Sequence, residues 1–220
     1  MKRLSALLIA LTGAAVFGLV GCSNGDTFEK TAYISGENKI EKIVVQVEDR
    51  ELEIVTSKDN RIRIDYFDGE KEYLDISVSE NKELTVKLVF DKKWTDFIGT
   101  KPSAEYRKIK IEIPDSLIEV FSASTTNGDI KVSALSFTRH IGLDTNGGNI
   151  ICERVSTGKT IDLTAKNGNI AGTIIGGWDD FSISCNIKKG DCNLPASKEG
   201  GEKLLTASCN NGNINIEFVK

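Results

Sequence analysis

Two tryptophans and a pair of aspartates are the side chains best suited to contact a ligand. Trp178 is followed by Asp179 and Asp180, and Trp94 lies in the segment 91–106, which lacks the alternation of a strand. An exposed indole ring can stack on a sugar ring, and adjacent carboxylates can accept hydrogen bonds from sugar hydroxyls. We therefore predict a ligand-facing loop at these residues. The alternative is that the tryptophans fold over the edge of the domain.

Other titratable residues have spacings that catalysis or metal binding could use. Glu51 and Glu53 would lie on one strand face about 7 Å apart, near the separation of glycosidase carboxylates. Solvated carboxylates on a strand surface are far commoner, and we expect them here. His140 is the one histidine in the sequence, which excludes a multi-histidine metal site. We predict a protein that is not an enzyme, with no catalytic residue, no metal and no cofactor.

The N-terminus has the pattern of an export signal. Lys2 and Arg3 precede an uncharged apolar run over residues 4–20, and the run leads into Leu19-Val20-Gly21-Cys22. These four residues resemble a lipobox, the cleavage site of bacterial lipoprotein precursors. An uncleaved membrane anchor is the alternative, although the run is at the short end of the length that spans a bilayer.

The lipobox resemblance implies a lipid-anchored protein. Residues 1–21 would be removed as a signal peptide, and Cys22 would carry a diacylglyceryl group and acyl chains such as palmitate. Residues 22–30 would form the lipidated tether, at the extracytoplasmic face of the cell membrane. The chain has 28 basic and 32 acidic residues, and this acidic balance argues against nucleic acid and anionic membrane surfaces as partners.

A sequence repeat dominates the C-terminal half. Glycines recur at intervals of 20 to 22 residues, mostly within Asn-Gly pairs. Apolar or small residues alternate with polar ones on both sides of each glycine, a pattern typical of strands with one buried face. Each unit therefore predicts a strand, a turn and a strand, and we expect the glycine to supply a positive φ in the turn. The aligned glycines are Gly128, Gly148, Gly168, Gly190 and Gly212.

An Asp or Asn follows each of these glycines. A short side chain at this position can hydrogen-bond the turn backbone, and in stacked units these side chains could form a ladder. Bound Ca²⁺ is the alternative. Only Asp129 and Asp191 of the five carry charge, so we favour the structural role.

Two all-β architectures fit these units. Asn-Gly is the commonest hairpin turn, so the units could be antiparallel hairpins of a β-sandwich. Alternatively, each unit is one coil of a β-solenoid, stacked in parallel on the next. We favour the solenoid because the inward-facing residues keep the same offset from the glycine in all five units. A single domain is predicted over 31–220, with irregular units over 31–115 and regular Asn-Gly units over 116–220.

Four cysteines fall at inward-facing positions of the repeat, namely Cys152, Cys185, Cys192 and Cys209. We expect buried free thiols that pack as small apolar groups. Export would permit one disulfide. Cys185 and Cys209 would lie on neighbouring coils but two positions out of register, which makes their geometry marginal.

The ordered series of motifs resembles a known family. Ile113-Pro114-Asp115-Ser116-Leu117 is followed by Ser124-Thr125-Thr126-Asn127-Gly128-Asp129-Ile130-Lys131-Val132 and by further Asn-Gly-Asn-Ile units. This series resembles the bacterial DUF4097 β-strand repeat family, whose members are also called adhesins, over roughly residues 40–220. The resemblance implies a β-helix-like fold on the bacterial envelope. It implies no catalytic residues.

These observations predict a lipid-anchored, adhesin-like binding or scaffold protein of the cell envelope, with wall glycan or an envelope protein as partner. Some relatives are associated with envelope-stress operons, so a regulatory partner of a membrane protein is the alternative. A polysaccharide-active enzyme is disfavoured because Ser, Thr and Asn dominate the outward strand positions. The strand ending at residues 214–218 is a candidate exposed edge through which copies could self-associate.

Overall fold

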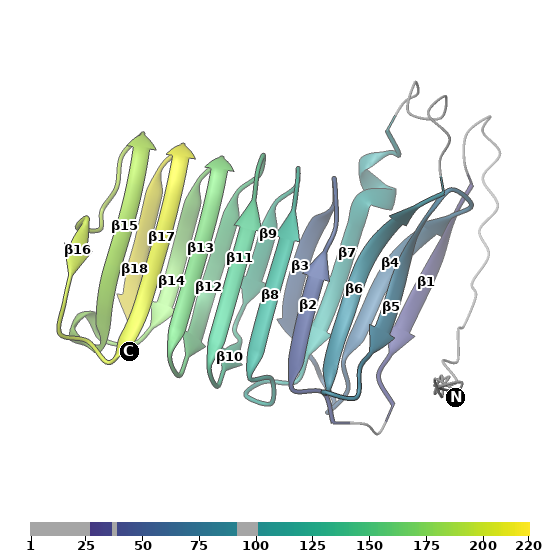
Figure 1. The fold of residues 1–220 in the computed structure, drawn as a ribbon, viewed down its shortest axis with the longest axis horizontal. Coiled ribbons are helices and arrows are strands. Elements are labelled where there is room, and N and C mark those ends of the chain that lie inside the picture. Colours follow the sequence, from purple (N-terminus) through teal and green to yellow (C-terminus); the bar gives the residue numbers. More distant parts are fainter. Residues whose placement is uncertain (1–26, 37–38, 92–100) are drawn as a thin grey trace, which may run out of the picture.

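The structure is a computed structural model that describes residues 27–36, 39–91 and 101–220. Cys22, the predicted signal peptide and Trp94 lie outside the described residues. Within them the chain is almost entirely β-structure, with two short 3-10 helices at Ala104–Arg107 and Trp178–Asp180 (Figure 1). The strands are β1 (Phe28–Ile34), β2 (Lys42–Gln46), β3 (Glu51–Thr56), β4 (Arg63–Gly69), β5 (Glu72–Val78), β6 (Glu83–Phe90), β7 (Lys108–Ile113), β8 (Val120–Thr125), β9 (Ile130–Ser133), β10 (Ser136–Phe137), β11 (His140–Thr145), β12 (Ile150–Thr157), β13 (Thr160–Asn167), β14 (Ile170–Ile175), β15 (Phe181–Lys189), β16 (Ser197–Lys198), β17 (Lys203–Asn211) and β18 (Ile214–Val219).

The strands form two nine-stranded sheets packed on a shared hydrophobic core (Figure 1). Sheet A has the order β1-β4-β7-β3-β9-β12-β14-β18, with β10 beside β12, and sheet B has the order β16-β15-β17-β13-β11-β8-β2-β6-β5. Neighbours in the middle of both sheets run parallel, and antiparallel pairs occur only towards the ends, as in β1–β4, β5–β6 and β15–β16. The chain passes repeatedly from sheet B to sheet A and back, which confirms the predicted β-solenoid.

Equivalent residues of different units lie side by side in sheet B. Phe121 pairs with Ile141, Ile141 with Ile161, Ile161 with Leu205, and Leu205 with Ile183. All five side chains are buried, so the offset from the glycine predicted the inward face correctly. The hairpin alternative is wrong, because the two strands of one unit pair with other units and not with each other.

The coils do not follow the order of the chain. The last unit, formed by β17 and β18, lies between the third unit and β15, whereas the repeat predicts sequential stacking. The physical reason lies in residues 190–194, which form no second strand and make only an isolated bridge from Cys192 to Ile214. An incomplete unit inside the stack would leave the facing edges of β14 and β18 without backbone partners. At the end of the stack, it leaves sheet A continuous.

The positive φ predicted for the repeat glycines is present at Gly128, Gly190 and Gly212, with φ of 159°, 124° and 149°, but not at Gly148 and Gly168. A Cβ atom added to Gly148 would lie 2.0 Å from the carbonyl oxygen of Gly128, and one added to Gly168 would lie 2.0 Å from that of Gly148. Glycine is required at these corners because the backbones of neighbouring coils approach too closely for any side chain.

The residues after the glycines form the predicted ladder along the stack. Oδ1 of Asp129 accepts a hydrogen bond from the backbone N–H of Asn149, and Oδ1 of Asn149 accepts one from Asn169, both at 2.9 Å. Asn169 and Asn213 continue the series to the N–H groups of Asn213 and Asp191, at 2.8 and 2.9 Å. These side-chain oxygens therefore satisfy backbone amides at the corner between the sheets.

Candidate functional site

Trp178 lies at the C-terminal end of the solenoid, between β14 and β15. The residue is 44% exposed, and its ring meets the ring of Phe218 in β18 edge to face, with centroids 5.5 Å apart. Nζ of Lys198 lies 5.5 Å from the indole centroid, within range of a cation–π contact. The indole thus rests on the end of sheet A and keeps part of its surface open to solvent.

The two aspartates after Trp178 do not act as a pair. Oδ2 of Asp180 accepts a hydrogen bond from the N–H of Gly177 at 2.7 Å, and the N–H of Asp180 donates to the carbonyl of Gly177 at 3.0 Å. Asp180 therefore closes its own turn, while Asp179 is exposed beside it. Lys198 comes from β16, which pairs antiparallel with β15, and the repeat pattern held no signal that it would approach the indole.

A shallow groove crosses the outer face of sheet B over β2, β8, β11 and β13. Its volume is about 220 Å³. Gly142 lies between Ser122 and Asp162 in register, and the missing side chain at this position helps to form the hollow. Other polar groups on its wall come from Gln46, Ser124, Asp144 and Thr164. Sequence reasoning placed these residues on the outward face but did not identify the groove.

The groove carries polar groups that the fold itself does not use. Within the part of the chain that the structure describes, the side chains of Gln46, Ser122, Asp144 and Thr164 have no hydrogen-bond or ion-pair partner. Hydroxyl, amide and carboxylate groups arranged in rows across parallel strands can exchange hydrogen bonds with a hydroxyl-rich ligand. This arrangement of polar groups is suited to binding such a ligand.

His140 lies beside the groove on the outer face of sheet B. Its Nδ1 is 2.7 Å from Oγ1 of Thr160 and 3.6 Å from Oδ2 of Asp162. Its Nε2 would be 2.8 Å from a Cβ atom at Gly142, so the imidazole leans over that glycine. His140 therefore lies next to the groove without lining it, and the hydrogen bond with Thr160 positions its ring.

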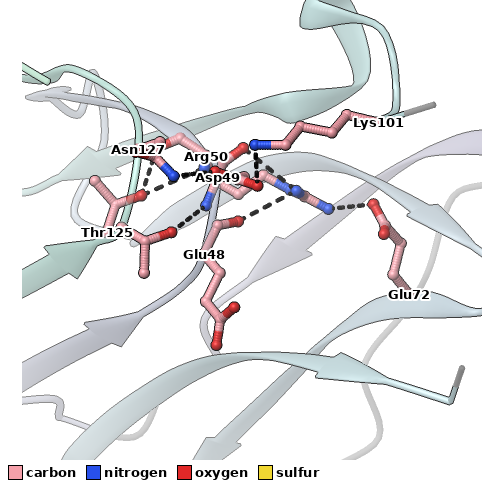
Figure 2. Close-up of polar contacts among 8 residues, drawn as sticks. Glu48, Asp49, Arg50, Glu72, Lys101, Thr125 and Asn127 are labelled. Atoms are coloured by element: carbon pink, nitrogen blue, oxygen red, sulfur yellow. Dashed lines mark hydrogen bonds and ion pairs between the residues drawn. The ribbon is translucent and has the colours of Figure 1, made fainter. Parts of the chain in front are cut away.

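A second polar cluster, at the corner between β2 and β3, is structural. Arg50 is almost completely buried, and its Nη2 donates to Oε1 of Glu72 at 2.6 Å (Figure 2). Nη1 of Arg50 also donates to the carbonyls of Glu48 and Asp49, at 3.3 and 3.4 Å. Thr125 donates its hydroxyl to the carbonyl of Arg50 at 2.9 Å. The cluster ties the N-terminal strand β5 to the regular coils.

Asp49 occupies the place in this corner that Asn takes in the regular units. Its carboxylate accepts hydrogen bonds from Asn127 at 2.6 Å and forms an ion pair with Lys101 at 2.8 Å (Figure 2). Burial by itself would raise the pKa of Asp49, but the contacts with Lys101 and Asn127 outweigh it and the pKa is lowered. The carboxylate of Asp49 therefore has a structural role.

The carboxylates of Glu51 and Glu53 do not form an isolated catalytic pair. Glu51 lies 2.8 Å from Nζ of Lys131 and 3.9 Å from Nζ of Lys108, while Glu53 is exposed on the same strand. The hydrogen bond from Lys131 to Glu51 raises the pKa of that lysine. Among the described residues, no group of three or more His, Cys, Asp or Glu side chains is arranged to hold a metal ion.

Parallel coils, end strands that close them and a polar outer face define a β-solenoid of the repeat type. More specifically, the chain belongs to the Toastrack DUF4097 family, whose model matches residues 40–217. None of the curated proteins matches the chain. No helix in the described residues is both long enough and apolar enough to cross a bilayer.

Solved structures also resemble the chain. A candidate cell adhesion protein from Clostridium sporogenes superposes with a TM-score of 0.66 at 12% identity, covering 88% of this chain and 100% of the other. A candidate adhesin from Bacteroides fragilis has a TM-score of 0.37 at 14% identity, covering 90% and 100% of the two chains. At these identities, the first similarity shows a shared fold.

Proposed function

We propose that this protein is a non-enzymatic, adhesin-like binding protein of the bacterial cell envelope, anchored by a lipid on Cys22. The lipobox supports export to the extracytoplasmic face of the cell membrane. Family membership and the fold shared with a candidate cell adhesion protein support a binding role at the surface. On this proposal, the solenoid is a rigid support that presents its outer face to a partner.

The groove on sheet B carries the proposal. Its polar side chains come from four adjacent parallel strands, which are spaced about 4.8 Å apart. Each strand contributes one polar side chain to the same row, namely Gln46, Ser124, Asp144 and Thr164. A wall glycan also repeats its hydroxyl and amide groups along one direction, so it could hydrogen-bond several strands in succession. Trp178 would add a stacking contact near the C-terminal end of the same body.

In each pair of carboxylates that could suggest an enzyme, one member is held by a structural contact. Glu51 is paired with lysines, and Asp180 closes the turn that holds Trp178. These contacts support binding over hydrolysis. Turnover of wall glycan by the purified protein would contradict this part of the proposal.

Sedimentation with insoluble wall glycan tests the binding site. Ser122→Arg would place a long cation in the groove, whereas Asn215→Arg would place the same side chain on the exposed outer face of β18 in sheet A. We expect Ser122→Arg to weaken binding by about tenfold or more, because it fills the groove, and Asn215→Arg to change it by less than about twofold. Both variants should keep the far-ultraviolet circular dichroism of the parent.

The outcomes separate the candidate partners. If the parent protein does not sediment with wall glycan, or if both variants bind as it does, the glycan-binding groove is wrong. Cross-linking in cells provides the second readout. Capture of a single membrane protein, together with no retention on glycan, would favour the regulatory alternative over adhesion.

A further inference from the structure

Two thiols meet at the C-terminal end of the solenoid. Sγ of Cys185, in β15, lies 3.1 Å from Sγ of Cys192, in the segment that follows this strand. The N–H of Leu194 points to the Cys192 sulfur at 3.3 Å, which fixes the position of that side chain. The repeat predicted a marginal pair between Cys185 and Cys209 instead. It missed Cys192 because residues 190–194 leave the regular strand path.

These two cysteines are associated with different sheets of the solenoid. Cys185 belongs to sheet B, where it pairs with Ala207 of β17. Cys192 forms a bridge with Ile214 of β18, the last strand of sheet A. A covalent bond between the two sulfurs would therefore join the ends of both sheets.

Residues 190–198, here called the end cap, close the core at this end. Leu194 is buried in the core, and the carbonyl of Ala196 accepts a hydrogen bond from the N–H of Cys185 at 2.9 Å. The side chain of Asn193 hydrogen-bonds both the N–H and the carbonyl of Ile216, at 3.0 and 2.8 Å. The end cap thus covers part of the free edge of β18 through a small number of noncovalent contacts.

We propose that Cys185 and Cys192 form an intramolecular disulfide that locks the end cap onto the solenoid. A disulfide oxidant such as oxidised glutathione accepts the two electrons that the two thiols lose. The thiolate of Cys192 attacks one glutathione sulfur and releases one glutathione thiol. The thiolate of Cys185 then attacks the Cys192 sulfur and releases the second. Two protein thiols lose two protons and two electrons, and one oxidant disulfide is reduced to two thiols.

The surroundings of the other cysteines favour this pairing over others. Cys209 stands beside Ile187 in register, and its thiol donates to the carbonyl of Gly168 at 3.3 Å. Cys152 is buried in β12, which β14 separates from β18 and the end cap. Cys192 is the more exposed member of the proposed pair, so it offers the oxidant its entry point.

Peptide mapping tests the bond directly on the full chain. The folded protein is incubated with oxidised glutathione, its remaining thiols are alkylated, and it is digested with trypsin. Cleavage after lysine and arginine places each of these four cysteines in its own peptide, namely 140–154, 167–188, 190–198 and 204–220. We expect one linked product, joining 167–188 to 190–198. A link that involves 204–220 instead, or the recovery of all four peptides unlinked, would overturn the proposal.

Two variants separate the bond from general damage to the fold. Cys192→Ser changes a half-buried side chain and should abolish the linked product, whereas Cys209→Ser should leave it intact. Oxidation should also slow hydrogen exchange at the amides of Asn193 and Ile216 about tenfold or more, because it restrains the end cap. The same treatment of Cys192→Ser should leave these exchange rates unchanged. Equal slowing in that variant would show that the bond does not lock the cap.

Discussion

At the level of single residues, the close approach of neighbouring coils gives the repeat glycines their importance. We expect Gly148→Ala to destabilise the protein by more than about 2 kcal/mol, because its new methyl group would meet a backbone carbonyl that cannot move without shifting the next coil. Urea unfolding measures the change.

Gly36→Ala is the matched control for this substitution. No atom lies within 4 Å of a Cβ atom added at Gly36, so its effect should stay within about 0.5 kcal/mol. If the two alanine variants prove equally stable, close backbone packing does not explain the regular spacing of glycine along this chain.

The buried ion pair between Arg50 and Glu72 gives a second prediction. Both side chains are at most 4% exposed, so Glu72→Gln would leave the Arg50 charge buried without its counter-ion. We expect a loss of about 3–5 kcal/mol in the free energy of unfolding. The double variant Arg50→Met/Glu72→Gln should recover part of this loss, because it also removes the buried charge.

An exposed pair provides the comparison for Glu72. Glu119 and Arg139 lie 3.6 Å apart with side chains 38% and 56% exposed, and Glu119→Gln should cost less than about 1 kcal/mol. Thermal unfolding of both single variants measures the difference. Similar losses in the two would mean that burial contributes little to the effect at Arg50.

At the level of elements, β18 illustrates how the fold protects a sheet edge. The predicted free edge at residues 214–218 is indeed the last strand of sheet A, but Asn193 covers its middle by hydrogen bonding Ile216. We expect Asn193→Ala to expose these backbone groups and to cause concentration-dependent self-association. Sedimentation velocity over a range of concentrations measures it.

Asn215 lies on the same edge strand and is exposed, with its side chain on the outer face. Asn215→Ala removes an equal amide from the strand but leaves the Asn193 contacts in place, so it should remain at the association state of the parent. Self-association by both variants, or by neither, would contradict a protective role for Asn193.

The sequence predicted the elements better than it predicted their order. Alternation identified inward residues such as Phe121 and Ile161, because burial on one strand face has a fixed period of two. It could not identify the neighbours of each coil, since the inward rows of all units consist of apolar or small residues that fit one another. The decisive feature was a missing strand after Gly190, which places β15 at the end of the stack.

The candidate site was predictable only in part, for a related reason. Trp178 stood out as an aromatic residue followed by two aspartates, and it is exposed. The groove on sheet B depends on four strands meeting in register around Gly142, and Lys198 reaches the indole through a short antiparallel pair. Such features depend on pairing between distant segments, and a local pattern does not contain that information.

At the level of the whole molecule, the order of the coils changes what the C-terminus does for stability. In a sequential solenoid, the last unit contacts only its predecessor and can be removed with little effect on the rest. Here β17 stands between β13 and β15, and β18 is the partner of β14. The last 18 residues of the chain, 203–220, therefore supply an interior strand of sheet B and the end strand of sheet A.

Truncation after Glu202 tests this topology. We expect β15 to lose its parallel partner, so that its amides exchange with solvent at rates close to those of an unfolded chain, while amides of β11 remain protected. Hydrogen exchange followed by mass spectrometry reads both strands in the same sample, with β11 as the internal control. Retained protection in β15 would mean that it pairs directly with β13 once the gap is open. In that case, the strand order would be set by the presence of the last unit and not by the incomplete unit that precedes it.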